Sequence, residues 1–271
     1  MMRVGSRPRR AGLTTAPLPI VSLGLVAALF FVLPLAGLLL RAPWDDLPGA
    51  LVSPPVVAAL KLSLICSLWA VALSVVLGLP LAWLLARVDF PGRSVLRGIA
   101  TLPVVLPPVV GGVALLLALG RRGLVGRWLD STFGVTLFGS VPAVIIAETF
   151  VAMPFLVISV EAALRSIDRR YEDAAQTLGA SRWTVFRRVT VPLIARSVGA
   201  GALLAWARAL GEFGATITFA GNLPERTQTI PLAVYIELQR EVEGAIALSM
   251  ILVAISLAVL VALRDRWWRV A

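Results

Sequence analysis

The sequence contains no histidine, a single cysteine and a single lysine among its 271 residues. Without histidine, neither a Ser-His intramembrane protease nor a His-based metal enzyme has the groups that it needs. The lone Cys66 excludes a disulfide within the chain and argues against a zinc or haem site built on His and Cys. The lone Lys61 does not follow a glycine, so no G-x-x-x-x-G-K-[ST] phosphate loop is present. We therefore expect no metal, no cofactor and no ATP site in this chain, and no enzyme activity of its own.

Apolar residues dominate what is present. They make up 59% of the chain, against roughly 45–50% in soluble domains. The expected fold class is therefore an all-α integral membrane protein. The net charge of +10 raises the alternative of a nucleic-acid partner. The arginines lie at the ends of apolar segments, however, where they fix membrane topology, so we expect no nucleic acid to bind.

Six stretches are long and apolar enough to cross the hydrocarbon core, which takes about 20 residues. They are residues 18–40, 56–86, 98–120, 135–160, 197–219 and 245–263. The first is longer than the roughly 7–15 residues of a signal-peptide core, so we interpret it as a membrane span. These boundaries predict a basic tail at 1–17, a first transmembrane helix at 18–40, a core of five more helices at 56–263 and a tail at 264–271.

An even number of spans places both termini on one side of the membrane. With both termini in the cytoplasm, most arginines lie on the inner side, seven of them between Arg165 and Arg196. This excess is what the positive-inside rule requires, so we expect both termini and the polar segment 165–196 to be cytoplasmic. The outer loop 120–130 is an exception with three arginines. A solvated surface helix is the favoured explanation, and attraction of anions or of an acidic outer partner is the alternative.

The polar segment 165–196 has internal order. Four residues with i, i+3, i+4, i+7 spacing predict one face of a short helix: Tyr171, Ala174, Ala175 and Leu178. Gly179 can end this helix in the left-handed conformation. Ser181 can then cap a second helix that runs through Trp183 and Phe186 to Pro192. Small side chains on such a helix let another protein's backbone approach closely, which predicts a docking element.

The spacing inside this segment also carries a resemblance. Asp173, Ala174 and Ala175 are followed by Gly179, Val189 and Val191-Pro192. This pattern resembles the EAA loop of binding-protein-dependent ABC importer permeases, E-A-A, three residues, G, nine residues, I-x-L-P. Asp173 stands where that family has Glu, and Glu172 can share the acidic role. The alternative, an ordinary amphipathic loop, does not account for the spacing.

A second resemblance concerns the cargo. The segments TLPVVLPPVVGG at 101–112, ARALGEFGATITFAGN at 207–222 and RTQTIPLAVY at 226–235 resemble the molybdate permeases of that superfamily. The related sulfate and thiosulfate permeases commonly have Tyr where Phe213 stands. The same machinery for sulfate, thiosulfate or tungstate is therefore the nearest alternative. An ATP-independent anion transporter or channel, and an integral membrane enzyme, are disfavoured because the chain has a docking loop and lacks catalytic groups.

The resemblance implies a type I ABC importer permease architecture in the inner membrane of a prokaryote. It also implies the partners, namely a second copy of this permease, two cytoplasmic ATPase subunits and an extracytoplasmic molybdate-binding protein. In that family the short helix sits in a cleft of the ATPase subunit and moves with it. Membrane lipid surrounds the spans.

Three charged residues lie within the expected spans, Glu148, Arg208 and Glu212. A charge in lipid costs about 2.5–3.5 kcal/mol on insertion scales, so these side chains should face protein or water. Arg208 and Glu212 are four residues apart, which predicts an intramembrane ion pair. The alternative is that Arg208 lines the anion path. Glu148 is expected to serve packing or gating.

Small and hydroxylated residues follow this pair. Gly211, Gly214, Thr216 and Thr218 fit either a pore-lining span or close helix packing, and the sequence does not choose between them. Pro107 and Pro108 are expected to kink the third span, because neither can donate a backbone hydrogen bond.

Overall fold

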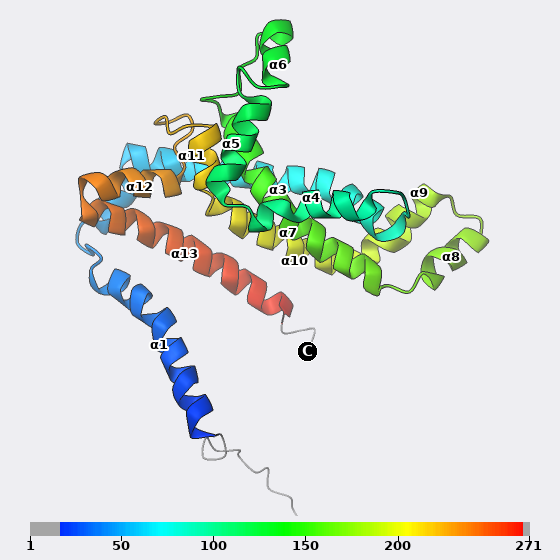
Figure 1. Cartoon of the computed structure of the whole chain (residues 1–271). Coiled ribbons are helices and arrows are strands. Elements are labelled where there is room, and N and C mark those ends of the chain that lie inside the picture. Colours follow the sequence, from blue (N-terminus) through cyan, green and yellow to red (C-terminus); the bar gives the residue numbers. More distant parts are fainter. Residues whose placement is uncertain (1–16, 268–271) are drawn as a thin grey trace, which may run out of the picture.

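The computed structural model describes residues 17–267, and this part of the chain contains helices and no strands. Figure 1 shows the arrangement. The helices, in chain order, are α1 (Leu18–Leu40), α2 (Leu47–Val52), α3 (Pro54–Arg87), α4 (Arg93–Val105), α5 (Pro108–Leu119), α6 (Gly126–Phe133), α7 (Val141–Ser166), α8 (Arg170–Thr177), α9 (Arg182–Val185), the π-helical η2 (Phe186–Thr190), α10 (Val191–Leu210), α11 (Gly214–Phe219), α12 (Ile230–Arg240) and α13 (Val242–Trp267). The expected tails at 1–17 and 264–271 fall largely outside the described residues.

The centre of the molecule is built from three long helices, α3, α7 and α10, that lie side by side. Two glycines allow their close approach. A Cβ at Gly78 of α3 would stand 3.1 Å from the side chain of Leu156 in α7. A Cβ at Gly201 of α10 would stand 3.0 Å from the Cβ of Ser159, also in α7. Small residues at such crossings are what close packing in a membrane requires.

We predict that Gly201→Leu destabilises the protein, because the added side chain has no space against α7. Overpacking of this kind costs about 1–3 kcal/mol. Gly24→Leu is the matched control, since a Cβ at Gly24 of α1 meets nothing within 4 Å. The measurement is the melting temperature of the detergent-purified chain, which should fall for Gly201→Leu only. Equal melting temperatures for the two variants would contradict this packing.

The third expected span is not one kinked helix. The structure divides it into α4 and α5, with Leu106 and Pro107 in extended conformation between them. Pro107 disfavours the helical conformation of the residue before it, and Pro108 then occupies the first turn of α5, where its missing N–H costs nothing. The expected kink at this place is therefore corrected to a break.

The fifth expected span is also interrupted. α10 ends at Leu210, Gly211 to Phe213 form a turn, and α11 covers only Gly214–Phe219. The fourth expected span, 135–160, is shifted, because α7 begins at Val141 after a loop and continues to Ser166. The core of the molecule is thus formed by helices whose ends differ from the expected spans by up to nine residues, as at Leu210, where α10 ends.

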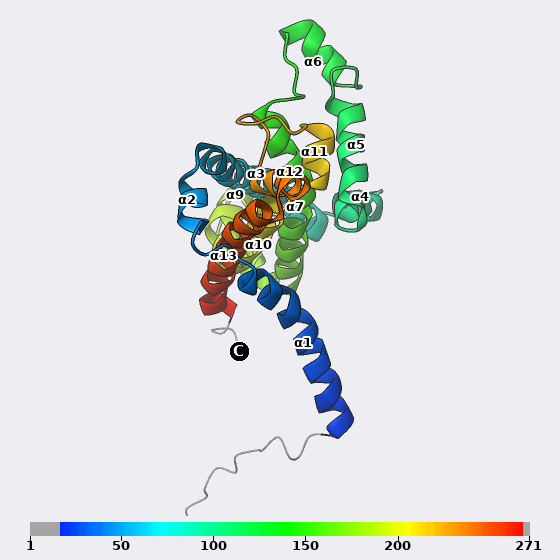
Figure 2. The ribbon, with the colours of Figure 1, turned by 90° about the vertical axis from the view of Figure 1, so that its left-hand side faces the viewer.

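Four helical stretches are long and apolar enough to span a membrane: Leu18–Leu40, Pro54–Arg87, Val141–Ser166 and Arg182–Leu210. Two shorter apolar helices, Pro108–Leu119 and Val242–Ala258, fall in the third and sixth expected spans. The count of six therefore stays a prediction. α1 extends away from the bundle in both views, although it contacts α13, and none of its residues is buried (Figures 1 and 2).

Candidate functional site: the exposed two-helix loop and the polar network behind it

The loop between α7 and α10 contains the short helix that the sequence predicts. α8 spans Arg170–Thr177, and together with α9 it lies at the end of the long helices opposite α12 (Figure 1). The predicted face is open to contact, since Tyr171 is 61% and Leu178 88% exposed. Ala174 is exposed and Ala175 half-buried. Asp173 is exposed as well, so the helix presents an apolar and small surface with one carboxylate beside it.

Both predicted helix boundaries in this loop are confirmed. Gly179 has a φ of +85°, in the left-handed region, and nothing lies within 4 Å of where its Cβ would be. Glycine stands there for its backbone conformation and not for lack of space. Ser181 precedes α9, and its hydroxyl oxygen accepts a hydrogen bond of 3.2 Å from the backbone N–H of Thr184.

Glu172, next to Asp173, turns inward. One carboxylate oxygen, Oε1, accepts hydrogen bonds from Nη2 of Arg87 at 3.3 Å and from the hydroxyl of Thr190 at 2.8 Å. The side chains of Arg87 and Glu172 are only 7% and 14% exposed. Arg87 ends α3 and Thr190 ends η2, so this carboxylate contacts the ends of two other elements.

The segment that joins α9 to α10 is wider than an α-helix. η2 has π-helical hydrogen bonding, and Pro192 follows it in the first turn of α10. A proline ring clashes with the carbonyl of the residue four positions before it, here Arg188, and the wider turn relieves that clash. The ring of Phe186 in η2 packs edge-on against Trp83 of α3 and stacks on Trp183 of α9, with centroids 6.1 and 5.6 Å away.

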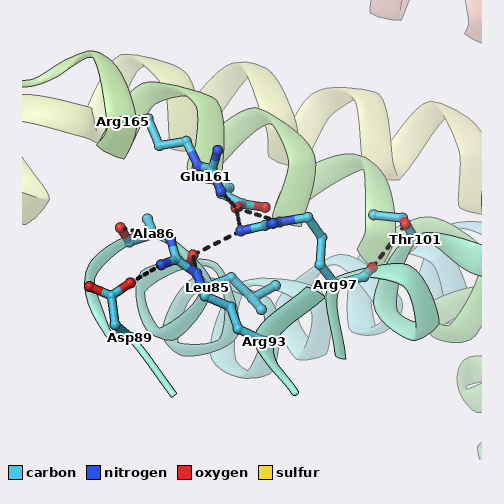
Figure 3. A network of polar contacts seen from close by, with 8 residues as sticks. All are labelled: Leu85, Ala86, Asp89, Arg93, Arg97, Thr101, Glu161 and Arg165. Carbon is cyan, nitrogen blue, oxygen red and sulfur yellow. Dashed lines mark hydrogen bonds and ion pairs between the residues drawn. The ribbon is translucent and has the colours of Figure 1, made fainter. Parts of the chain in front are cut away.

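A second polar network surrounds the carboxyl end of α3 (Figure 3). The carbonyl of Leu85 accepts hydrogen bonds from Arg93 and Arg97 of α4, at 2.7 and 3.2 Å. Arg97 also donates to Glu161 of α7 at 2.9 Å, and Arg165 pairs with the same carboxylate at 2.7 Å. Arginine side chains thus satisfy carbonyls that the end of a helix leaves free, and they tie α3, α4 and α7 together.

Arg208 and Glu212 form the expected ion pair, with Nη2 and Oε2 2.5 Å apart. Glu212 does not share the helix of Arg208, because it lies in the turn after α10. Its other oxygen accepts a hydrogen bond of 2.8 Å from the backbone N–H of Ala215, in the first turn of α11. The Glu212 side chain is 1% and the Arg208 side chain 26% exposed, so the carboxylate is buried and the guanidinium reaches toward the surface.

Glu148 of α7 is 1% exposed and lies within electrostatic range of Glu212 and Cys66. Its Oε2 has no hydrogen-bond partner among residues 17–267. The same holds in that range for the hydroxyl of Thr216, which is fully buried. The structure thus brings Glu148, Arg208, Glu212 and Thr216 to one polar region around the α10–α11 turn.

Of the remaining candidates near this turn, Gly214 and Thr218 lie where α11 contacts α5, and Gly211 does not. A Cβ at Gly214 would stand 2.9 Å from the Cβ of Pro108, so α11 and α5 approach closely there. The Thr218 hydroxyl donates to the carbonyl of Gly214 at 2.7 Å, within its own helix. Gly211 is exposed at the end of α10, and its surroundings leave ordinary space for a Cβ.

The arginine-rich loop 120–130 leads into α6, which stands out from the bundle (Figures 1 and 2). Arg121 donates to Asp130 at 3.1 Å and Thr136 donates to the same carboxylate at 3.0 Å. These hydrogen bonds, that from Arg121 first, hold the pKa of Asp130 below its usual range. A groove of about 720 Å³ beside them is lined by Arg121, Arg122 and Arg127 among others.

Sequence reasoning missed the residues that face α8 and Glu161 from other helices. Arg87, Arg93 and Arg97 counted only as charges that fix topology, and Glu161 fell just outside the expected span 135–160. The available signal was the amphipathic character of residues 93–105, whose arginines lie four apart on one helix face.

An all-helical chain with several apolar helices, buried charges between them and an exposed two-helix loop is a multi-pass membrane protein. Residues 74–270 match the family described as "Binding-protein-dependent transport system inner membrane component". This chain belongs to that family of inner membrane transport components.

Three similar proteins are informative. The molybdenum transport system permease protein ModB of Mycobacterium tuberculosis is 44% identical over 249 residues, which are 91% of this chain and 93% of that protein. The sulfate transport system permease protein CysT of Escherichia coli is 34% identical over 267 residues, 96% and 94% of the two chains. The crystal structure of a bacterial ABC transporter that imports alginate has a similar chain, with a TM-score of 0.70, 23% identity and 92% coverage of both chains. This last similarity concerns the fold alone.

Proposed function

We propose that this chain is the channel-forming permease subunit of an ATP-driven importer for molybdate. The chain supplies the route through the inner membrane and is not itself an enzyme. Two copies form the channel, two separate ATPase subunits supply the energy, and an extracytoplasmic binding protein delivers the oxyanion. The observation that supports molybdate as the transported ion is the 44% identity to a molybdenum permease over 91% of the chain. The identity to a sulfate permease is 34%.

The docking role rests on α8. Its exposed face combines small residues with Tyr171 and Leu178, and the chain turns sharply at Gly179 into a helix continuous with α10. An ATPase cleft that receives this face moves the loop when the ATPase dimer closes. The excess of arginines in segment 165–196 and near the termini supports a cytoplasmic position for this face by the positive-inside rule, on the side where ATP is.

The transport path is proposed to run beside the α10–α11 turn. The backbone breaks there and at Leu106–Pro107, and such irregular backbone in a membrane is tolerated where it is buried in protein or lines a cavity. Arg208 pairs with Glu212 in this turn and is partly exposed. Weak binding suits a channel, since a tight anion site would slow release.

The test is ATP hydrolysis by the reconstituted complex. Molybdate-loaded binding protein is expected to stimulate hydrolysis, and tungstate-loaded protein to do nearly the same because the two ions have similar size and charge. Stimulation by sulfate-loaded protein without stimulation by molybdate-loaded protein would overturn the cargo assignment.

A further inference from the structure

The two acidic residues of α8 face different environments. Asp173 is exposed beside the docking face, whereas Glu172 is 14% exposed and directs its Oε1 atom into the protein. Adjacent helix positions point about 100° apart, so one helix can offer a carboxylate to a partner and another to its own core. Asp173 is therefore available to a partner protein, whereas Glu172 contacts other helices of this chain.

Glu172 contacts an element to which α8 has no nearby chain connection. The chain links α8 to α7 on one side and to α9 on the other. Arg87, its ion-pair partner, ends α3 and lies 85 residues earlier in the sequence. Thr190, the other donor, is 1% exposed and ends the π-helical η2 directly before α10.

We propose that Glu172 is a positioning residue that carries movement of α8 to α3 and to the start of α10 at once. This proposal rests on the proposed function. The contact joins two oppositely charged and mostly buried side chains and is directional, so a shift of α8 is expected to displace Arg87. Thr190 lies in η2, a π-helical turn of the kind that occurs frequently at functional sites.

The route continues from α3 into the rest of the bundle. Two residues before Arg87, the carbonyl of Leu85 accepts hydrogen bonds from Arg93 and Arg97 of α4. Arg97 also donates to Glu161 of α7. The break at Leu106–Pro107 ends α4 and begins α5, which packs against α11 beside the Arg208–Glu212 pair. A series of contacts thereby connects Glu172 of α8 to both interrupted spans.

The test compares Glu172→Gln with Asp173→Asn in the complete complex of permease, ATPase and binding protein in proteoliposomes. The quantity measured is oxyanion uptake per ATP hydrolysed. For Glu172→Gln we expect assembly with the ATPase and continued hydrolysis, but uptake per ATP reduced roughly five- to tenfold, at the lower end of typical coupling factors. Asp173→Asn, on the outer side of the same helix, should instead weaken assembly with the ATPase.

A role in folding alone predicts the opposite pattern, since it would lower the amount of assembled complex and leave uptake per ATP unaltered. An unchanged ratio for assembled Glu172→Gln therefore overturns the proposal. If that variant does not accumulate, Arg87→Gln and Thr190→Val each remove one donor to Glu172, and a wild-type ratio in both overturns the proposal equally. Absence of ATP-dependent uptake by the unaltered complex would instead refute the proposed function, so the two failures are distinct.

Discussion

Arg208→Gln is expected to lower the free energy of unfolding by about 3 kcal/mol, because it leaves the Glu212 carboxylate buried without its cation. This figure lies at the low end for a broken buried pair, since the Arg208 side chain is 26% exposed. The measurement is thermal unfolding of the purified chain in detergent. Glu212→Gln should cost less, because its amide oxygen can still accept the hydrogen bond from Ala215.

The double variant Arg208→Gln with Glu212→Gln separates two roles of the pair. If the pair serves structure, the double variant should recover most of the stability lost by Arg208→Gln, since no unpaired charge remains. Recovery of stability together with uptake supports a structural pair. Recovery of stability without uptake assigns Arg208 to the anion path. A double variant as unstable as Arg208→Gln would contradict the ion-pair account.

Leu178→Asp is expected to weaken binding of the ATPase subunit roughly ten- to a hundredfold. Burial of a leucine side chain contributes about 1.5–3 kcal/mol, and the substitution also brings a charge into an apolar contact. Leu178 is 88% exposed in the isolated chain, so its loss should not disturb the fold. The measurement is the affinity of the purified ATPase for the permease in detergent.

The matched control is Leu124→Asp, at the start of the α6 loop. Leu124 is also 88% exposed, but it lies near α6 and far along the chain from α8. The Leu124→Asp variant should bind the ATPase with the same affinity as the unaltered chain. Equal affinity for Leu178→Asp and Leu124→Asp would show that the α8 face does not meet the ATPase.

Local signals made much of the docking loop predictable. The i, i+3, i+4, i+7 spacing predicted α8, and the glycine that follows it predicted the end of this helix. A serine before the next helix predicted the cap of α9. α1 matches its expected range, 18–40, because an apolar stretch bounded by polar residues defines its own ends. Each of these features depends on residues within one or two helical turns.

Features that depend on distant parts of the chain were not predictable in this way. The contact of Glu172 with Arg87 joins residues 85 positions apart, and no pattern within α8 reveals it. The turn at Gly211 to Phe213 lies within an otherwise mostly apolar stretch, and it forms where Glu212 pairs with Arg208 and accepts a hydrogen bond from the first turn of α11. Periodicity gives the face of a helix, whereas tertiary hydrogen bonds decide where the helix stops.

The most direct test of the whole account measures molybdate transport across the membrane of proteoliposomes that contain this chain. ATPase and ATP are placed inside the vesicles in one preparation and outside in the other, and molybdate-loaded binding protein is placed on the opposite side. We predict accumulation only where ATP and ATPase lie on the side of α8, and none when either is omitted. Accumulation without the ATPase would contradict the account, because it would make this chain a transporter that needs no partner at α8.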